Sequence, residues 1–500
     1  MQPDYVLTKS RITTGLKCPQ KLWFDVNDRI RKDSYLFHLG NRFGDFARSH
    51  YGEGYDLTGN LDAPDALAKT EAAISDPKIG IIYEAAFLFN KTLVRTDVLI
   101  RKGAHWEMVE VKSSSGVKND HIIDATLQTY IVKNSGLDLT KIKIAHINAD
   151  FIYEGREKYE GLLAEVDITT DVNTAIPNAK TWIKQLLPIA EKGSLPPLTP
   201  MGEQCGSGSS ACLYKNKCEK FLGEPPEVPI SILPYVGKRM SEIWAKEGIY
   251  DLRDLPLEVL SKPIQKIIQQ AHRDGKDWIS VELREQIRHF SWPRFFMDFE
   301  TVQQGVPLIE KTKPREAVPF QWSVHKWESP DHELNIEQNF GFLKYTGVNL
   351  ERQFLLELIE VLGDHGPIFA HRADTERKVL KDIVEKESCQ DLRPTVDAIL
   401  KRVICTLDMV REGFYSPKMK GSYSLKDIVK AIPNSVAYSS DDLEMQKSEV
   451  ANGGDAMIAW FKCTDPSTSR EDVNRISENL DEYCSKDTFA LYQLFKFINP

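Results

Sequence analysis

The feature that most constrains the fold is a pair of strand-like segments within residues 94–111, joined by a turn at Gly103. Apolar and polar residues alternate in both segments, as they do in strands that bury one face. The alternation places Asp97 on the first strand and both Glu110 and Lys112 on one face of the second, so we expect these three side chains to gather at one pair of strand ends. Two carboxylates can hold Mg²⁺ or Mn²⁺, while an ammonium can orient a water and offset phosphate charge.

The next segment narrows this interpretation, because alternating charges on their own also fit a solvated strand. Residues 119–136 have the apolar spacing of a helix that brings Gln128 to one face with Asp124, with Tyr130 close by. Residues 141–150 then have the pattern of another strand. The predicted order is therefore strand, strand, helix, strand.

These residues and their order resemble the restriction-endonuclease-like P-D-(D/E)-x-K core, in its RecB-type branch, over residues 5–222. The resemblance implies a nuclease domain in which Asp97 and Glu110 bind a catalytic Mg²⁺ or Mn²⁺ and Lys112 assists the attack on phosphate. It also implies that the helix contributes two catalytic residues, Gln128 and Tyr130.

Two further acidic residues have open roles in this domain. The RecB-type branch often carries a histidine on an upstream helix, but the corresponding stretch here has Gly44 and Asp45. Asp45 is either a substitute metal ligand or an ordinary solvent-facing acid. Glu84, in the segment IIYEAAFLF, either adds a ligand or ends a strand.

Four of the eight cysteines bracket the same region, namely Cys18, Cys205, Cys212 and Cys218. Their arrangement resembles the iron–sulfur staple of CRISPR-associated RecB-like exonucleases and of the AddB nuclease family, which implies that these thiolates hold a [4Fe–4S] cluster. A structural Zn²⁺ and unliganded thiols remain the alternatives, because the C-x6-C-x5-C spacing is looser than is usual in that group. We expect no disulfides, since the sequence opens without a secretory signal.

The composition is that of a globular chain with room for two or three domains, at 500 residues, 41% hydrophobic and 27% charged. The net charge of −9 argues against bulk attraction to nucleic acid, so binding has to use local basic strips and metal ions that bridge to phosphate. Candidate strips, each more often simply a solvated face, are residues 29–32, residues 215–220, and Arg372 with Arg377 and Lys378. No apolar run reaches membrane-spanning length, and we expect a cytoplasmic protein without a membrane partner.

A proline-rich stretch after Cys218, GEPPEVPISILP, disfavours helix and indicates a linker. Beyond it, residues 231–260 place an apolar-glycine turn before one helix and a second short helix after Gly248. This pattern resembles a helix-hairpin-helix module that grips a nucleic-acid backbone, and it fits a plain helical connector equally well. We therefore assign no site residues there.

A second acidic set begins in RFFMDFETV, where Asp298 and Glu300 alternate along a short apolar strand and so share a face. The large apolar residues around them indicate an interior strand, and buried carboxylates side by side need a cation. Residues 367–380 have the pattern of a strand that enters a helix. Near the end of the chain, Tyr483 and Asp487 lie four residues apart on an amphipathic helix, which stacks them on one face.

These segments resemble the DnaQ-like (DEDD) 3′→5′ exonucleases, which have a ribonuclease-H-like fold. The resemblance implies two divalent cations and a tyrosine, Tyr483, that positions the attacking water. The third acid is ambiguous, because the family's H-N-x-x-F-D run is replaced here by His371-Arg372-Ala373-Asp374-Thr375-Glu376. Alignment on the following leucine favours Glu376, with Asp374 as the fallback. The implied metal ligands are Asp298, Glu300, Glu376 and Asp487.

Nearly the whole chain is similar to a bacterial family that fuses a RecB-like iron–sulfur nuclease to a DnaQ-like exonuclease. The sequence thus predicts an α/β multidomain protein with a restriction-endonuclease-like core and its cluster at 1–222, a helix-hairpin-helix-like connector at 223–290, and a ribonuclease-H-like mixed-sheet domain at 291–500. The predicted function is a nuclease with two active centres that degrades nucleic-acid ends, single-stranded DNA in preference to RNA. The alternatives are an RNA-trimming exonuclease whose first domain mainly binds substrate, and a non-catalytic adaptor that binds DNA or senses redox state.

Overall fold

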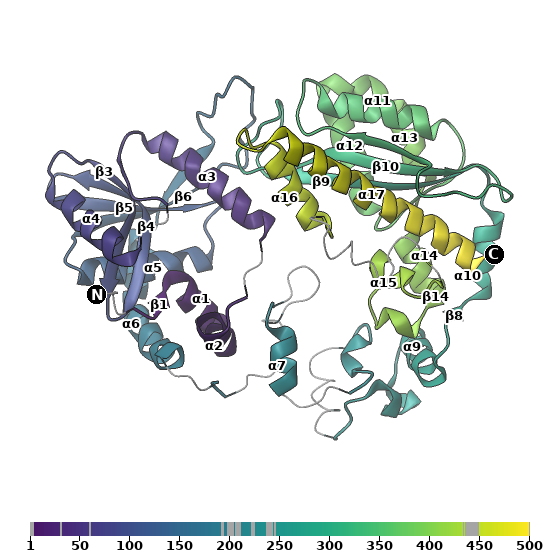
Figure 1. Ribbon diagram of the computed structural model, residues 1–500, viewed down its shortest axis with the longest axis horizontal. Coiled ribbons are helices and arrows are strands. Elements are labelled where there is room, and N and C mark those ends of the chain that lie inside the picture. The colour runs from purple at the N-terminus through teal and green to yellow at the C-terminus, as the bar shows by residue number, and fades with distance from the viewer. Residues whose placement is uncertain are drawn as a thin grey trace. The chain divides into compact units, whose positions relative to one another are not determined.

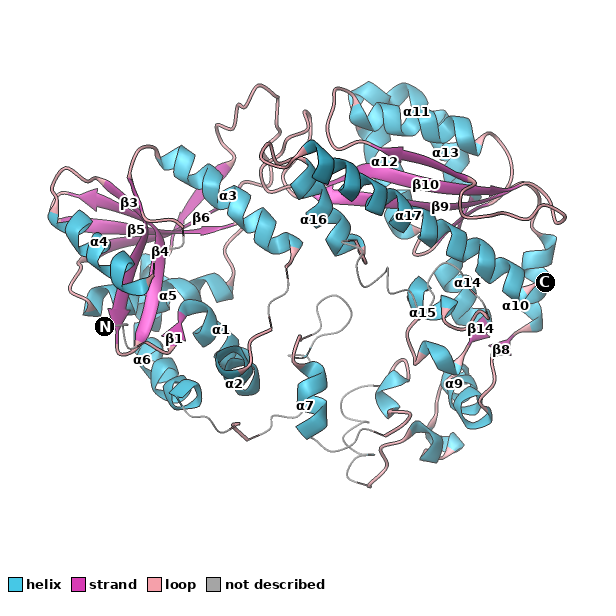
Figure 2. Cartoon of the chain, in the orientation of Figure 1, coloured by secondary structure: helices cyan, strands magenta, loops and turns pink. Residues whose placement is uncertain are grey.

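Two compact units make up the protein, one of residues 1–224 with 304–315 and the other of residues 225–303 with 316–500. Each unit combines helices with a sheet, which confirms the prediction of an α/β multidomain protein (Figure 1 and Figure 2). The computed structural model describes residues 5–30, 33–59, 62–191, 195–197, 205, 212–221, 226–236, 244, 247–433, 435 and 450–499.

The first unit is built on a seven-stranded sheet. Its strands are β1 (Leu7–Thr8), β2 (Tyr55–Asp56), β3 (Ile81–Phe89), β4 (Thr92–Lys102), β5 (His105–Lys112), β6 (Leu139–Ile147) and β7 (Leu163–Asp167). They follow the order β2-β3-β4-β5-β6-β7, with β1 paired to β4. The pairs β3/β4, β4/β5 and β6/β7 are antiparallel, whereas β5 and β6 are parallel. A parallel pair needs a crossover connection, and here a helix supplies it.

The helices of this unit are α1 (Lys9–Lys17), α2 (Pro19–Asn27), α3 (Tyr35–Tyr51), α4 (Ala63–Ser75), α5 (Asn119–Asn134), α6 (Thr169–Glu191) and α7 (Lys215–Phe221). Helix α5 is the crossover, so β4, β5, α5 and β6 form the strand, strand, helix, strand order that the sequence predicts. Helices α1, α5 and α6 pack on one face of the sheet, where Leu99, Met108 and Leu127 are fully buried, and α3 packs on the other face (Figure 1).

Residues 304–315 belong to the first unit although they follow the connector in sequence. The segment closes on itself through a 2.7 Å hydrogen bond from the Arg315 amide to the Gln304 carbonyl. It pairs with Tyr153 through two backbone hydrogen bonds, of 2.7 Å from the Lys311 amide and of 3.1 Å to the Thr312 carbonyl. The first unit is therefore assembled from two separate stretches of chain.

The second unit is built on a five-stranded sheet of β9 (Arg294–Gln303), β10 (Ala317–Trp327), β11 (Asn339–Leu343), β12 (Ile368–Ala370) and β13 (Val403–Cys405). The order is β11-β10-β9-β12-β13, which places β9 at the centre. Strand β10 is antiparallel to β9 and β11, whereas β12 is parallel to β9 and β13. The sheet is therefore mixed. A separate antiparallel pair joins β8 (Trp278–Ile279) to β14 (Phe414–Tyr415).

The α-helices of this unit are α9 (Pro263–Asp274), α10 (Val281–His289), α11 (Leu350–Leu362), α12 (Asp374–Glu385), α13 (Arg393–Arg402), α14 (Thr406–Gly413), α15 (Leu425–Val429), α16 (Gly453–Cys463) and α17 (Arg470–Ile498). Successive side chains of β9 point to opposite faces of the sheet. The ring of Phe296 packs against Phe495 of α17, with centroids 5.3 Å apart, and that of Phe299 packs against Phe354 of α11 at 5.0 Å. Helix α17 thus covers the face of β9 that carries the acidic residues.

The predicted connector contributes to the core of the second unit. Leu252 and Leu255 are fully buried in one apolar cluster with Phe296. Where the sequence predicts a second hairpin helix after Gly248, the structure has two 3-10 turns, η4 (Leu252–Asp254) and η5 (Leu257–Val259). Most of the first hairpin helix falls on residues 237–243 and 245–246, which lie outside the described residues.

Candidate active sites

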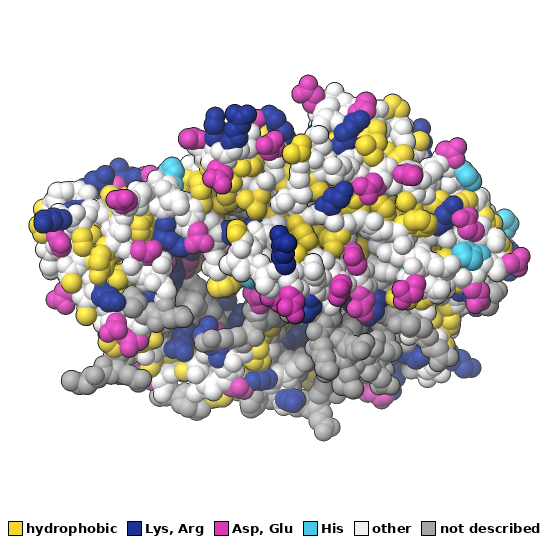
Figure 3. Space-filling model, turned by 45° about the horizontal axis from the view of Figure 1, so that its top comes forward, with side chains coloured by type: hydrophobic (Ala, Val, Ile, Leu, Met, Phe, Trp, Pro, Cys, Tyr) yellow, Lys and Arg dark blue, Asp and Glu magenta, His cyan; other side chains and the backbone are white. Residues whose placement is uncertain are grey.

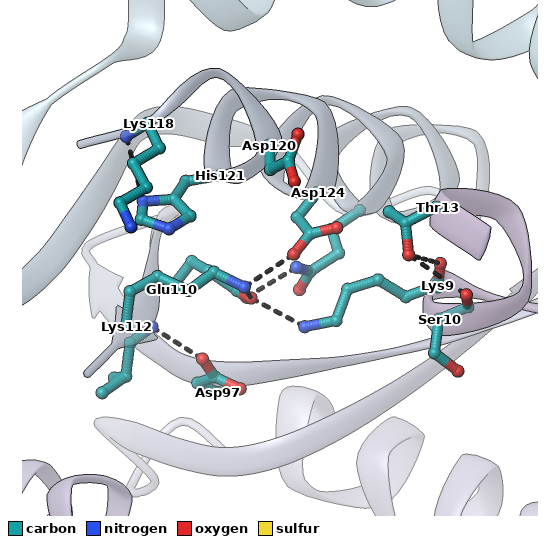
Figure 4. Close-up of polar contacts among 12 residues, drawn as sticks. Lys9, Ser10, Thr13, Asp97, Glu110, Lys112, Lys118, Asp120, His121 and Asp124 are labelled. Carbon is teal, nitrogen blue, oxygen red and sulfur yellow. Dashed lines mark hydrogen bonds and ion pairs between the residues drawn. The ribbon is translucent and has the colours of Figure 1, made fainter. Parts of the chain in front are cut away.

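The β4–β5 hairpin places the two predicted carboxylates of the first site next to each other. Val98 pairs with Val109 across the hairpin, so Asp97 and Glu110 come from facing positions. The Oδ2 atom of Asp97 accepts a 2.6 Å hydrogen bond from the Val111 amide. This bond fixes Asp97 to the strand that carries Glu110 (Figure 4).

Three donors from three different elements hold the carboxylate of Glu110, whose side chain is 1% exposed. The Oε1 atom lies 2.7 Å from the Lys9 ammonium of α1 and 2.8 Å from the Lys112 ammonium of β5. The Oε2 atom accepts a hydrogen bond from the Gln128 amide of α5 at 2.5 Å. Lys112 has a second partner, Asp124 of α5, at 2.6 Å (Figure 4). The structure therefore brings the predicted residues 97, 110, 112 and 128 together.

The electrostatics of the two carboxylates differ although they are neighbours. The pKa of Asp97 is raised to about 7, mainly by burial and then by the negative charge of Glu110. The positive charge of Lys9 lowers this pKa, but by less than Glu110 raises it. Burial also acts to raise the pKa of Glu110, but the charges of Lys9 and Lys112 outweigh it and bring that pKa to about 2. Glu110 is therefore ionised, whereas Asp97 titrates near neutrality. The two acids differ because the nearby ammonium groups contact Glu110, while Asp97 is buried beside the negative charge of Glu110.

A cavity of about 770 Å³ opens beside Asp97 and is lined in part by Gly44, Asp45 and Glu84. Asp45 forms an ion pair with Arg48, and its side chain is 66% exposed. Of the two roles considered for Asp45, the structure therefore favours an ordinary solvent-facing acid over a metal ligand. Glu84 lies inside β3 with a left-handed φ of 56°, so the alternative in which it ends a strand is wrong. Burial raises its pKa, and the charge of Glu110 adds to the effect. A strained backbone at such a position is typical of functional sites.

Tyr130, the other residue predicted on α5, packs by its ring against Phe89, edge-on with centroids 5.9 Å apart. It joins the apolar residues that line the core of the first unit. Its observed contacts are therefore structural.

The cysteine-bearing segments approach each other through their neighbours. Tyr214, between Cys212 and Cys218, stacks on Phe24 of α2 with ring centroids 5.1 Å apart, and α2 begins directly after Cys18. The Cys212 amide donates to the Cys205 carbonyl at 2.8 Å. The Tyr214 hydroxyl also donates to a carboxylate of α2 at 2.6 Å. Among the described residues no cysteine forms a disulfide.

The second site lies on β9 beneath α17. Asp298 and Glu300 share one face of β9, opposite Ser323 and Gln321 of β10. Their pKa values show that other acids lie near. Burial raises the pKa of Asp298 well above its ordinary value, and Asp487, Glu300 and Glu376 each raise it further. Burial raises the pKa of Glu300 to about 8, with added repulsion from Asp487 and Glu376. Acids from β9, α12 and α17 therefore form one group.

The structure distinguishes between the two candidates for the third acid. Glu376 is 3% exposed, and burial raises its pKa to about 8. Its Oε2 atom is buried without a hydrogen-bond partner among the described residues. Asp374 is 97% exposed and pairs with Arg377 at 3.4 Å. Since α12 begins at residue 374, a helical offset of two residues turns one carboxylate into the unit and the other into solvent.

Two neighbours complete this site. The Lys426 ammonium lies 4.9 Å from the centroid of the Tyr483 ring. The Cys484 thiol lies 3.6 Å from Asp298 Oδ2. Arg372, which replaces the asparagine usual in DnaQ-like exonucleases, is exposed and has a left-handed φ of 60°. The preceding His371 is held by Tyr423 and by a threonine of α14, so its position does not depend on an asparagine beside it.

Several of these residues have metal-binding chemistry, yet within the described ranges no three Asp, Glu, His or Cys side chains already stand in the arrangement of a metal site. The orphaned Glu376 oxygen and the mutual repulsion of its neighbours fit a cation in the second unit. In the first unit the oxygens of Glu110 are taken by ammonium and amide donors, while Asp97 and Glu84 carry the raised pKa values that a cation would reverse.

A family model described as a domain of unknown function, DUF2779, matches residues 295–424. The match begins in β9 and ends before α15, so it covers Asp298, Glu300 and Glu376 but not Tyr483 or Asp487. No curated protein matches the chain. In the part of the chain that the structure describes, we find no helix with the length and apolar character needed to span a membrane.

Charged side chains of both signs are spread over the surface of this acidic protein (Figure 3). Among the described residues on the face shown in Figure 3, Lys and Arg side chains are interspersed with Asp and Glu side chains. Of the predicted basic strips, residues 31–32 lie outside the described residues, and Arg377 is engaged by Asp374 and by the Val403 carbonyl.

Sequence reasoning missed Lys9 and gave no role to Asp124 or Cys484. Lys9 lies 101 residues from Glu110 in sequence, and a single lysine at the start of a helix carries no periodic signal. Asp124 lies on the predicted face of α5, four residues before Gln128, and that spacing is a signal that could have identified it.

Proposed function

We propose that the protein is a metal-dependent nuclease with two active centres that degrades single-stranded DNA from its ends, with 3′→5′ exonuclease activity in the second unit. The observation that carries the proposal is the acidic group of that unit. Asp298, Glu300, Glu376 and Asp487 come from three separate elements and repel one another in a largely buried place. Buried like charges are costly unless a cation neutralises them, and such groups are typical of catalytic sites.

The sheet supports a ribonuclease-H-like fold of the DnaQ type for this unit. The sheet is mixed, its central strand carries Asp298 and Glu300, and α17 covers the same face with Tyr483 and Asp487. The order of these segments along the chain is the one that the resemblance implies.

The contacts of the first unit support a RecB-like P-D-(D/E)-x-K site. Asp97 and Glu110 face each other on the β4–β5 hairpin, and both Lys112 and Gln128 contact Glu110. Helix α5 connects β5 to β6, and its Gln128 amide donates to Glu110 of β5.

The residues that would hold Mg²⁺ or Mn²⁺ are Asp97 and Glu110 in the first unit and Asp298, Glu300, Glu376 and Asp487 in the second. Such cations, when bound, lower the pKa of water and stabilise charge on the phosphate. The chain's own groups do the rest: Lys112 offers a proton donor beside Glu110, and the Tyr483 hydroxyl can orient a water. Burial of these groups strengthens each interaction, because the local dielectric is low.

Cys18, Cys205, Cys212 and Cys218 would hold a [4Fe–4S] cluster, or Zn²⁺ as the alternative. The stacking of Tyr214 on Phe24 supports this, since it brings the cysteine-rich segment to the helix that follows Cys18. Thiolate ligation there would tie the two ends of the unit together and supply folding energy.

The test is to substitute Asp97→Asn and Asp298→Asn, separately and together, in the full-length protein. Each variant is assayed with Mn²⁺ on single-stranded DNA and RNA oligonucleotides labelled at either end. Asp298→Asn should abolish removal of nucleotides from the 3′ end, Asp97→Asn should abolish the remaining cleavage, and the double variant should be inactive.

Two matched controls use exposed acids from the same helices as the site residues. Asp120, near the start of α5, pairs with Lys17, and Asp374 opens α12, so Asp120→Asn and Asp374→Asn should keep full activity. Full activity in the double site variant, or no Mn²⁺-dependent cleavage by the unmodified protein, would refute the proposal. Preference for the RNA substrate would assign the activity to RNA trimming instead.

A further inference from the structure

Lys9 is built into the first site by the fold. Strand β1 pairs with β4, the strand that carries Asp97, in the register Leu7 to Thr92 and Thr8 to Leu93. Helix α1 begins at the next residue. The Thr8 side chain caps that helix by accepting a hydrogen bond from the Arg11 amide. The backbone of Lys9 is therefore fixed between the sheet and α1, and its side chain extends toward the two carboxylates (Figure 4).

Lys9 and Lys112 contact the same oxygen atom of Glu110 but differ in their other ion-pair partners. Both ammonium groups lie within 2.8 Å of Glu110 Oε1, at 2.7 Å for Lys9 and 2.8 Å for Lys112. Lys112 has a second carboxylate, Asp124, at 2.6 Å. Among the described residues Glu110 is the only hydrogen-bond partner of the Lys9 ammonium, and the Lys9 side chain is 26% exposed. Displacement of Lys9 would thus break no other hydrogen bond of its ammonium among the described residues, and its side chain is already partly exposed.

A metal ion and the Lys9 ammonium compete for the same place. The carboxylate of Glu110 already accepts from two ammonium groups and from the Gln128 amide. A divalent cation held by this pair would need carboxylate oxygens as ligands, and these donors already bind the oxygens of Glu110. Asp124 balances the charge of Lys112. A divalent ion added to Lys9 would still place three positive charges beside the two carboxylates of Glu110 and Asp97, one more than they can balance in a buried site.

We infer that Lys9 is a resident counter-ion of the Asp97–Glu110 pair, which a divalent cation displaces when it binds. Lys9 is then a positioning residue that keeps the two carboxylates together in the metal-free protein and weakens metal binding by competition. This inference rests on the proposed function of the first unit as a metal-dependent site.

The test measures Mn²⁺ binding directly, by the electron paramagnetic resonance signal of free Mn²⁺, in full-length protein that carries Asp298→Asn and Asp487→Asn. These two substitutions remove ligands of the second unit, so that the signal reports the first. In this background Lys9→Met should tighten Mn²⁺ binding about tenfold or more, because the competing cation is gone. Lys9→Arg, which keeps the charge, should leave the affinity near that of the background.

The matched control is Lys17→Met. Lys17 also lies on α1 and also pairs with an acid of α5, Asp120 at 2.6 Å, but both side chains are largely exposed and neither contacts Glu110. This variant loses an ion pair between the same two helices without changing the charge beside the carboxylates, so its Mn²⁺ affinity should not change.

A second measurement uses the chain with its lysines intact, and therefore does not depend on the folding of a variant. Acetylation by an amine-reactive reagent, read by mass spectrometry, should modify Lys9 several-fold faster with Mn²⁺ than without, while Lys17 reacts at the same rate. Mn²⁺ binding that requires Asp97 but is unchanged or weaker in Lys9→Met, or labelling of Lys9 that ignores Mn²⁺, would overturn the inference alone. Absence of any Asp97-dependent Mn²⁺ binding would overturn the proposed function of the first unit together with it.

Discussion

The buried carboxylates of the second unit should make the metal-free protein less stable as the pH rises. Burial raises the pKa of Glu376 from 4.5 to about 8 in the folded chain, whereas the unfolded chain ionises near 4.5. Unfolding therefore releases a proton between these two values, so this contribution to stability is fully present below about pH 4.5 and is lost as the pH rises toward 8. Within that window the loss is about 1.4 kcal/mol per pH unit. Between about pH 5.5 and pH 7.5 the free energy of unfolding therefore falls by about 2.5 kcal/mol in total.

The substitution Glu376→Gln removes this ionisation while keeping the shape of the side chain. The stability of the variant relative to the unmodified protein should thus rise by about 2.5 kcal/mol over the same interval. The variant should also gain less stability from Mn²⁺, because it has lost a carboxylate that would bind it. The assay is hydrogen exchange with mass spectrometry on peptides of α12 and α17, corrected for the pH dependence of intrinsic exchange.

The control is Asp374→Asn, which removes an exposed carboxylate from the same helical turn. Asp374 makes the smallest of the contributions to the pKa of Glu376, so the pH dependence of this variant's stability should stay close to that of the unmodified protein. If Glu376→Gln also follows the unmodified protein, or if Asp374→Asn changes the pH dependence equally, then Glu376 is not part of a buried acidic group and the reasoning is refuted.

Four further predictions concern other parts of the chain. Gly366→Ala should destabilise the second unit by more than about 2 kcal/mol in urea unfolding, because φ is 85° and a Cβ atom would lie 2.1 Å from the Pro293 carbonyl oxygen. Arg402→Met should cost about 2–4 kcal/mol in thermal unfolding, because the guanidinium donates to four backbone carbonyls at 2.6–2.8 Å. Burial lowers the pKa of His371 from 6.5 to about 4, so its ring should titrate near pH 4 by NMR, and the stability present above pH 6.5 should decline as the pH falls toward 4. Cys212→Ala should remove the broad absorption shoulder at the blue edge of the visible spectrum that an iron–sulfur cluster would give to anaerobically purified protein, and absence of that shoulder from the unmodified protein would argue against iron.

Local patterns predicted the elements whose residues interact with near neighbours in sequence. The alternation around Asp97 and Glu110, with Gly103 between them, predicts a hairpin, and a hairpin places its facing residues together whatever surrounds it. The apolar spacing of residues 119–136 likewise predicts α5 and the inward face of Gln128. Both depend on backbone geometry alone.

Contacts between distant segments could not be predicted in this way. Nothing in the residues around Lys9 indicates that β1 pairs with β4, and it is this pairing that carries the ammonium to Glu110. Alignment on Leu380 favours Glu376 over Asp374, but the burial of Glu376 depends on how α12 packs in the second unit, which a local pattern does not fix. Residues 304–315 have the charge and proline content of an ordinary surface loop, so nothing in their sequence predicts that they belong to the first unit.

That loop has a consequence for how the protein is made. The hydroxyl of Tyr159 donates to the Pro307 carbonyl at 3.0 Å, and Tyr153 stacks on Tyr159 with its backbone bonded to residues 311 and 312. A chain that stops at residue 224 would lack the segment that forms these hydrogen bonds with both tyrosines. On the ribosome, the amino-terminal half therefore stays unfinished until the connector and the central strand of the other sheet have been translated.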